Sequence, residues 1–351
     1  MNRLTLGLVG LLLPSIAAAQ TGTDLDAQGD AAKAQKNFPA AQTAYTQALA
    51  TNPQDLRAYI SRGSVRAKLG DNSGAIADDT AALALDPRNV VAFTNRGNAR
   101  AAAHDFPGAI ADYNHALTLD PKHAAAYLNR GNVENEQKNY PAALADYNQA
   151  LALHPNDLLA LYNRAGARRA TGDYPGALAD YSQVLAAQPA DVRARINRAV
   201  LRMAQRDWTG ASADLQKCLA QLPPDRQIYP RLYLWVVGVK QGNAARATQD
   251  LQQHLARTSA AYAATWPGQL ERLCAGQMRE PQLMLSAKDQ PKKGTSCFAQ
   301  ACYFAAIRRM ADHNPDGPAK LFQKSMKEGD PKMHETILAR EELKQMGAHT
   351  P

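Results

Sequence analysis

Cysteine and histidine are the residues of this chain most able to do covalent or metal chemistry, with 4 and 8 present. A cysteine beside His254, His313 or His334 could supply a nucleophile and a general base. However, the sequence surrounds them with no catalytic motif, has no Gly-rich phosphate loop and spaces no Cys or His pair as zinc ligands. We therefore predict a protein that is not an enzyme and that uses no cofactor or metal.

Arginine and aspartate recur in step at a spacing of 34 residues. The two sets are Arg62, Arg96, Arg130, Arg164 and Arg198, and Asp78, Asp112, Asp146, Asp180 and Asp214. Guanidinium and carboxylate groups form strong, charge-assisted hydrogen bonds. A row of arginines could instead hold an anionic ligand, but the local carboxylates would already engage those side chains. The pattern therefore predicts salt bridges that tie helices together.

Asparagine forms a second row at the same spacing, and two further asparagines lie three residues after members of it. The set is Asn95, Asn98, Asn129, Asn132, Asn163 and Asn197. An amide carries both a donor and an acceptor, so a row of them can pair with the N–H and C=O groups of an extended peptide. The alternative is that these amides only hydrogen-bond neighbouring helices. The row predicts a peptide-binding groove that reads backbone and not sequence.

The elements that position these rows are marked by proline, which recurs every 34 residues from Pro53 to Pro223. With each proline numbered as position 32, alanine stands at position 20 of all six units and glycine at position 8 of the first four. Such small residues let two helices approach closely. Asp or Asn at position 16 caps the second helix, and the closing proline ends it. Each unit is therefore predicted to be a helical hairpin.

This pattern, with an aromatic residue at position 24 as Tyr45, Tyr113, Tyr147 and Tyr181, resembles the tetratricopeptide repeat family over residues 22–223. The resemblance implies an all-α, right-handed superhelical solenoid whose first helices line a concave groove, where the asparagine row would lie. The basic residues of the family's carboxylate clamp are missing at position 5, which holds Thr94, Leu128 and Tyr162. The specificity of that clamp is therefore not expected here.

The N-terminus has the pattern of a secretory signal. Arg3 precedes an apolar run over residues 4–16, and three alanines then offer a cleavage site before Gln20. We predict a cleaved signal peptide over residues 1–19, with an uncleaved anchor as the alternative. No later stretch is long and apolar enough to cross a bilayer, so the mature chain is expected to be exported, to the periplasm or beyond, with no transmembrane segment.

The chain after the signal divides into a regular array and a looser C-terminal part. We expect six repeats over residues 20–223, a seventh altered hairpin over 224–260, and a helical region over 261–351 that holds a degenerate repeat (300–333) and a capping helix. Residues 230–345 resemble the end of the periplasmic repeat lipoproteins of the new lipoprotein I type, through matches that include Trp266, Pro267, Leu321 and Phe322. The lipid-anchoring cysteine of those proteins is missing. That resemblance implies a periplasmic adaptor that brings partners to envelope proteases or peptidoglycan enzymes.

The four cysteines would follow the chain into an oxidising compartment. Cys218, at position 27 of a repeat, is expected to be a buried thiol. Among the others we predict a disulfide between Cys274 and Cys297 that closes the loop over residues 291–294, with Cys302 as the competing partner.

The formal charge of +8 favours no nucleic-acid partner, because no block of five like charges and no alternation of aromatic and basic residues occurs. We therefore expect a non-enzymatic scaffold or adaptor in the bacterial periplasm that binds an extended peptide in the concave groove. The alternatives are a structural component of an envelope assembly, or an accessory subunit of a protease or peptidoglycan-processing complex.

Overall fold

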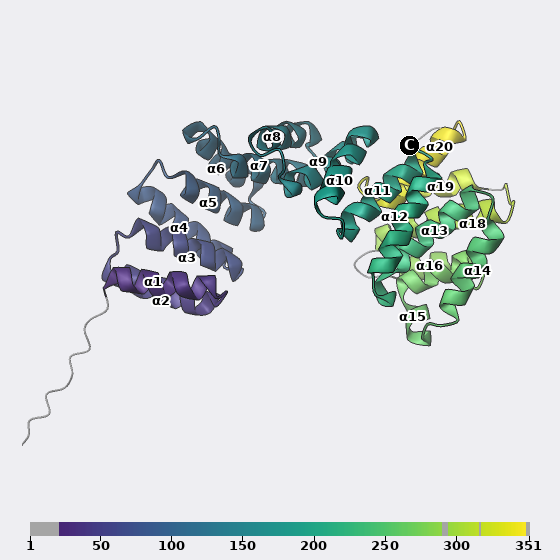
Figure 1. Ribbon diagram of the computed structural model, residues 1–351, viewed down its shortest axis with the longest axis horizontal. Helices are drawn as coiled ribbons and strands as arrows, with labels where there is room; N and C mark the ends of the chain where they lie inside the picture. Colours follow the sequence, from purple (N-terminus) through teal and green to yellow (C-terminus); the bar gives the residue numbers. More distant parts are fainter. Residues whose placement is uncertain (1–20, 290–293, 316, 349–351) are drawn as a thin grey trace, which may run out of the picture. The chain divides into compact units, whose positions relative to one another are not determined.

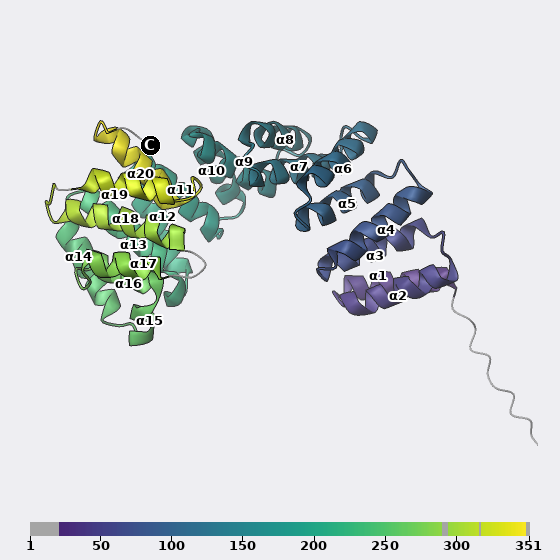
Figure 2. The same ribbon diagram turned by 180° about the vertical axis from the view of Figure 1, so that it is seen from behind.

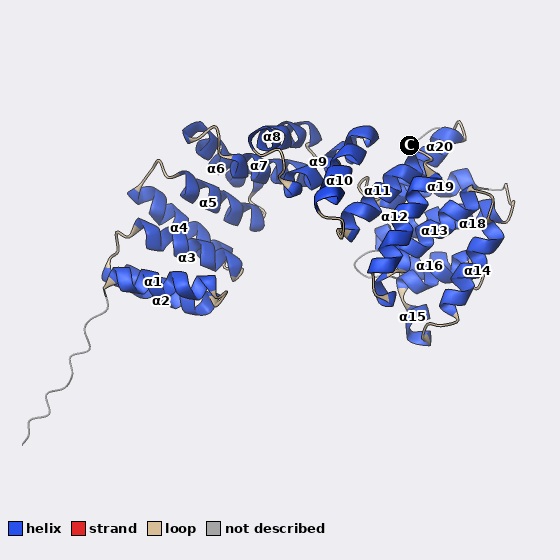
Figure 3. Ribbon diagram, viewed as in Figure 1, coloured by secondary structure: helices blue, strands red, loops and turns tan. Residues whose placement is uncertain are grey.

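The computed structural model describes residues 21–289, 294–315 and 317–348, so the signal peptide expected over residues 1–19 lies outside the described residues. Within these ranges every regular element is a helix and none is a strand (Figure 3). Consecutive helices pair as hairpins along the chain (Figure 1), and the view from behind in Figure 2 shows the same pairing. The expected all-α fold of repeated helical hairpins is confirmed.

Six hairpins, repeats 1 to 6, make up the regular array. Their helices are α1 (Gly22–Ala34) and α2 (Phe38–Thr51), α3 (Leu56–Lys68) and α4 (Asn72–Leu85), α5 (Val90–Ala102) and α6 (Phe106–Leu119), α7 (Ala124–Glu136) and α8 (Tyr140–Leu153), α9 (Leu158–Thr171) and α10 (Tyr174–Ala187), α11 (Val192–Ala204) and α12 (Trp208–Gln221). The chain forms two compact units that meet in sequence at Val133 and Glu134, within α7. Unit 1 precedes this point in the chain and unit 2 follows it.

The second helix of most repeats begins at a capped position. The side chain of Asp105 accepts a hydrogen bond from the backbone N–H of Gly108 at 3.0 Å, and Asp71, Asp173 and Asp207 cap α4, α10 and α12 in the same way. The preceding turn needs one residue with positive φ. Gly70 and Gly172 adopt it freely, whereas His104 has φ 61° there and carries the strain of a side chain.

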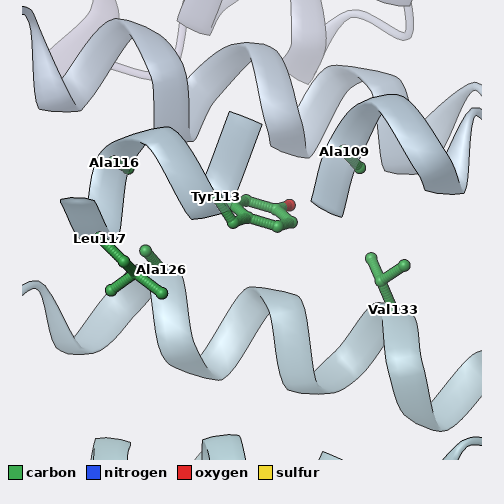
Figure 4. Close-up of a cluster of buried hydrophobic side chains, with 6 residues drawn as sticks. All are labelled: Ala109, Tyr113, Ala116, Leu117, Ala126 and Val133. Carbon is green, nitrogen blue, oxygen red and sulfur yellow. The ribbon is translucent and has the colours of Figure 1, made fainter. Parts of the chain in front are cut away.

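Repeats 1, 3, 4 and 5 have a buried tyrosine at position 24, and repeat 3 shows how it packs. A Cβ atom added to Gly97 of α5 would lie 2.7 Å from the ring of Tyr113, so only glycine allows the ring to lie against that helix. Tyr113 lies in one cluster with Leu117 and two alanines of α6 and with Ala126 and Val133 of α7 in the next repeat (Figure 4). The small residues at positions 8 and 20 thus make room for a ring that joins two repeats.

The chain after the array is also helical. Its helices are η1 (Pro224–Arg226), α13 (Ile228–Lys240), α14 (Ala244–Leu255), α15 (Ala260–Ala264), α16 (Trp266–Cys274), α17 (Glu280–Lys288), α18 (Gly294–Ala311), α19 (Pro318–Glu328) and α20 (His334–Gln345). Helices α18 and α19 pack as a hairpin, and α20 returns to contact α11 of the array. None of the helices in the described ranges is long and apolar enough to span a membrane.

The cysteines correct one prediction. Cys218, Cys274, Cys297 and Cys302 are all buried, and the bridge predicted between Cys274 and Cys297 is not formed. Burial raises the pKa of the Cys274 thiol well above its ordinary value and raises that of Cys302 to about 12. Because the thiolate is the species that forms disulfides, the raised pKa values of Cys274 and Cys302 disfavour the reactive form of these two thiols at neutral pH.

Repeat 2 departs from the tyrosine pattern at position 24, where it has Asp79, and repeat 6 has Leu215 there. Asp79 is 1% exposed, and neither carboxylate oxygen has a hydrogen-bond partner among the described residues. Burial, together with the neighbouring Asp78 carboxylate, raises the pKa of Asp79 to about 8. The side chain is therefore mostly protonated at neutral pH, since its charged form has no buried partner.

This site predicts a pH-dependent stability. The pKa of folded Asp79 lies above its ordinary value of 3.8, so its stabilising protonation is complete below about pH 4 and is lost as the pH rises through 8. Asp79→Asn should remove this fall and should exceed the wild type at pH 8 by about 2 kcal/mol in free energy of unfolding. Urea titrations at pH 4 to 9 measure it, with Asp289→Asn on an exposed residue as the control. Parallel pH profiles of the wild type and Asp79→Asn would contradict the assignment.

Candidate functional site

An arginine of the first helix binds an aspartate of the second in repeats 2, 3, 5 and 6. In repeat 3, Arg96 donates from Nε and Nη2 to the two carboxylate oxygens of Asp112, at 3.0 and 2.7 Å. The same bidentate pairs join Arg62 to Asp78, Arg164 to Asp180 and Arg198 to Asp214, each with an Nη2–Oδ1 distance of 2.7 Å. In repeat 4 the corresponding residues, Arg130 and Asp146, belong to different units. These contacts place the arginine row inside the hairpins.

A second arginine, at position 11, completes each of these pairs. Arg100 donates from Nη1 to the other oxygen of Asp112 at 2.8 Å and to the carbonyl of Gly108 at 3.3 Å. Arg66, Arg168 and Arg202 bind Asp78, Asp180 and Asp214 in the same way, at 2.9, 2.8 and 2.7 Å. These residues were not predicted from the sequence, although they recur at the same 34-residue spacing and Glu134 takes their place in repeat 4. Each of these buried aspartates is thus bound by two guanidiniums, and both arginines are already paired with a carboxylate of the same hairpin.

The asparagine row lies on the first helices, but its members are not equally available. In unit 1, Asn98 accepts hydrogen bonds from the hydroxyl of Tyr113 and from Nδ2 of Asn129, both at 2.8 Å. These two amides therefore tie neighbouring helices, as the alternative interpretation expected. Asn95 is half-exposed and has no hydrogen-bond partner among the described residues of its unit.

The remaining asparagines lie in more crowded surroundings. Asn132 and Asn163 are half-buried, and both make polar contacts. Asn197 donates to the hydroxyl of Tyr162 at 2.9 Å, while its Oδ1 accepts from Arg169 at 3.0 Å and lies 2.8 Å from Nε2 of His334. The amide of Asn197 is thus fully used within unit 2, and it is not available to a further peptide.

The partner of Asn197 belongs to residues 330–345, which we call the docked segment. Arg169 donates from Nη2 to the backbone carbonyl of Lys332 at 3.0 Å, and Lys332 donates to the carbonyl of Asn135 at 2.9 Å. The hydroxyl of Tyr174 contacts Glu341 at 3.1 Å. These residues of the array stand on α7, α9 and α10, so the docked segment lies against repeats 4 to 6 within unit 2. The surface formed by the first helices, the inner face, already holds a polypeptide there.

A polar network behind His334 fixes the docked segment. The hydroxyl of Tyr233 lies 3.2 Å from Nδ1 of His334 and donates to Glu335 at 2.7 Å. Burial lowers the pKa of His334 to about 3, and it raises the pKa of Glu335 above its ordinary value. Both groups are therefore held toward their neutral forms, as hydrogen-bonded groups in a dry interface should be.

In unit 1 the inner face forms a groove that no described segment of the same unit occupies. We call it the unit 1 groove, and its lining includes Arg57, Ile60 and Ser61 of α3 with Asn89 and Val91 at the start of α5. Val91 is 49% exposed, and Arg57 forms a salt bridge with Asp30 of α1. The groove thus offers apolar side chains beside polar ones, and the amide of Asn95 stands one helical turn further along α5.

The repeats of this chain match one known protein family. The tetratricopeptide repeat family matches residues 27–90, 94–157 and 162–226, more than half of the chain. No curated protein matches it. A tetratricopeptide repeat protein from Parabacteroides merdae, 18% identical, has a TM-score of 0.50 over 73% of this chain and 98% of that one. PilF of Pseudomonas aeruginosa, 19% identical, has a TM-score of 0.49 over 62% and 97%. The first likeness shows a common fold.

The shared aspartate of a repeat should carry much of its stability. Asp112→Ala leaves the guanidiniums of Arg96 and Arg100 half-buried without their counter-charge, so we expect a loss of about 3 kcal/mol in free energy of unfolding. Chemical denaturation of the variant measures this loss. Asp250→Ala, on an exposed aspartate, is the control and should change stability little. A loss below about 0.5 kcal/mol for Asp112→Ala would show that the pair acts only as a surface salt bridge.

Docking of residues 330–345 should weaken in acid. The pKa of folded His334 lies below its ordinary value of 6.5, so its contribution is complete above about pH 6.5 and falls as the pH drops toward 3. From pH 7 to pH 5 the wild type should therefore lose about 1–2 kcal/mol more in free energy of unfolding than His334→Gln does. The matched control is His123→Gln, which should keep the full loss. Equal losses in the wild type and in His334→Gln would contradict the assignment.

Proposed function

The chain belongs to the tetratricopeptide repeat family, and from this premise we propose that it is a non-enzymatic scaffold whose inner face binds an extended segment of a partner protein. Arrays of this kind present extended surfaces to other polypeptides. The observation that carries the proposal lies in the chain itself, because the inner face of repeats 4 to 6 holds the docked segment, which consists of the turn over residues 330–333 and helix α20.

The docked segment supports a recognition mode that depends in part on backbone. Arg169 binds the peptide carbonyl of Lys332, a group that every residue presents, while Asn197 adds an amide contact to the imidazole of His334. Contacts to backbone give affinity whatever the sequence, and side-chain contacts then select among segments. Asparagine and arginine donors on first helices supply both kinds of contact.

The unit 1 groove offers the same elements to a partner. Ile60 and Val91 provide apolar surface, the Asn95 amide provides an unused donor and acceptor, and Arg57 with Asp30 provides a charged edge. We infer a partner segment that is extended, places an apolar side chain against Ile60 and Val91, and presents backbone polar groups to Asn95. Burial of one such side chain contributes about 2 kcal/mol.

We further propose that the scaffold acts after export, in the periplasm, as an adaptor for envelope proteases or peptidoglycan enzymes. The N-terminal apolar run supports export, and the resemblance of residues 230–345 to periplasmic repeat lipoproteins supports the adaptor role. A structural component of an envelope assembly would use a broad apolar patch. The exposed large apolar side chains of the described residues are instead spread over separate helices, as Leu69, Leu159 and Leu285 illustrate.

Peptide selection tests the proposed groove. We expect peptides selected from a phage-displayed library on the mature protein to bind Val91→Glu at least about tenfold more weakly, because a charge replaces apolar contact. Asn95→Ala should weaken binding about fivefold, the value of one hydrogen bond. Fluorescence anisotropy gives the dissociation constants, and thermal melts check that each variant is folded.

The matched control is Leu85→Glu, which places the same charge on an exposed residue of the second helix α4. Its affinity for the selected peptides should equal that of the wild type. Equal binding by Val91→Glu, Asn95→Ala and Leu85→Glu would rule out the unit 1 groove as the binding surface.

A further inference from the structure

A second cleft lies in unit 2, away from the docked segment. Its floor is one side of α13, with Arg231, Trp235 and Gly238, and its walls come from α12 and α14. The wall from α12 presents Ser212, Gln216 and Leu219, whereas the wall from α14 and the turn after it presents Arg246, Asp250, His254 and Arg257. The lining is therefore polar and rich in arginine, unlike the apolar seams between regular repeats.

The cleft exists because the seventh hairpin breaks the repeat. Pro223 and Pro224 lead into η1, so α13 begins at Ile228 and not at 226, where the 34-residue spacing would start it. Helix α14 has 12 residues where the second helices of the regular repeats have 14. Its close approach to α13 is made by Gly238, whose added Cβ would lie 2.6 Å from the Cβ of Ala247. Helix α14 thus follows α13 closely and leaves a space beside α12.

Positive charge gathers at one end of this cleft, where Arg231 at the start of α13 meets His254 and Arg257 at the end of α14. No carboxylate of the described residues lies within ion-pair distance of either arginine. The Nε of Arg231 is buried with no hydrogen-bond partner, while its Nη2 donates to Gln227 at 2.6 Å. A buried donor without a partner is costly, and a ligand acceptor in the cleft would satisfy it.

Arg231 and Arg257 both lie near enough to His254 to lower its pKa. Burial and then the guanidiniums of Arg231 and Arg257 lower its pKa, so the ring is neutral at pH 7. Its Nε2 is also buried without a hydrogen-bond partner and lies 3.7 Å from Glu271. Burial raises the pKa of Glu271 to about 7, and its carboxyl group already accepts a hydrogen bond from Tyr262 at 2.8 Å. Arg231 and Arg257 thus bring two positive charges to this end of the cleft, where the Nε of Arg231 and the Nε2 of His254 lack hydrogen-bond partners among the described residues.

We propose that this end of the cleft binds a phosphate group, carried by a small molecule or free in solution. Two guanidiniums can share the oxygens of a tetrahedral oxyanion, and the buried Nε of Arg231 would gain its missing acceptor. A phosphate with one to two negative charges balances the charge that Arg231 and Arg257 present. A carboxylate carries a single charge and fewer acceptor oxygens, so it should bind more weakly.

Isothermal titration calorimetry of the mature protein with inorganic phosphate, in a chloride buffer at pH 7.5, tests this site. Arg231→Gln and Arg257→Gln should each weaken binding about tenfold, because each removes a charge-assisted contact. The matched control is Arg246→Gln, which removes the same charge from the same cleft. Arg246 stands eleven residues before Arg257, about 16 Å along α14 and the following turn, so its variant should bind like the wild type.

A second titration with glycerol phosphate separates the two sources. Tighter binding of the ester than of inorganic phosphate identifies the ligand as a phosphorylated small molecule, and the reverse order identifies free phosphate. Arg257 is exposed, so Arg257→Gln should fold even if Arg231→Gln does not. No measurable phosphate binding, equal losses in Arg246→Gln and Arg257→Gln, or equally tight binding of acetate would overturn the proposal.

Discussion

The buried aspartate of the second helix, which is Asp112 in repeat 3, is the constraint on which the array depends. Asp112 is 1% exposed, and a buried carboxylate persists only when its charge and its hydrogen bonds are matched. Arg96 and Arg100 supply both, and Arg100 also binds a carbonyl of the second helix. Arg96 also contacts the preceding repeat, because its Nη1 donates to the hydroxyl of Thr80 at 3.3 Å. The same charged side chains thus fix the distance between the two helices of a hairpin and the position of that hairpin against the preceding repeat.

This arrangement decides what the inner face can do. The arginines that pair with the buried aspartates are engaged inside the hairpins. Recognition on the first helices therefore depends on amides, exposed apolar side chains and the few other arginines. Three asparagines show the range of outcomes: Asn98 ties two repeats, Asn197 holds the docked segment, and Asn95 is unused among the described residues. In repeat 4 the second arginine is replaced by Glu134, which lies where the chain divides into its two compact units.

The spacing of the sequence was enough to predict the hairpins and the side chains that meet across them. Residues 34 apart occupy equivalent places, so Arg62 and Asp78 could be paired without a structure. Arg100 was missed, although its recurrence at the same spacing is visible. Asp79 is also visible as an aspartate in a tyrosine position, but its unpartnered burial is not.

Contacts between residues far apart in the sequence leave no repeated spacing from which they could be predicted. Arg169 and Lys332 are 163 residues apart, and no repeat links them, so the docked segment and the loss of Asn197 as a free amide could not be foreseen. The cleft between α12, α13 and α14 likewise depends on how one irregular hairpin departs from the repeat. The expected Cys274–Cys297 bridge rested on the oxidising compartment and on loop closure, and neither of these indicates the burial that keeps the Cys274 thiol protonated.

The central claim is that the inner face of the repeats is a polypeptide-binding surface, filled from within in unit 2 and available to a partner in unit 1. Hydrogen–deuterium exchange of the mature protein, with and without a peptide selected on it, tests this claim most directly. The account predicts that the peptide slows exchange in α3 and α5 and leaves α4, α6 and α20 unchanged. Protection confined to the second helices α4 and α6, or release of α20 with no change in α3 and α5, would contradict it.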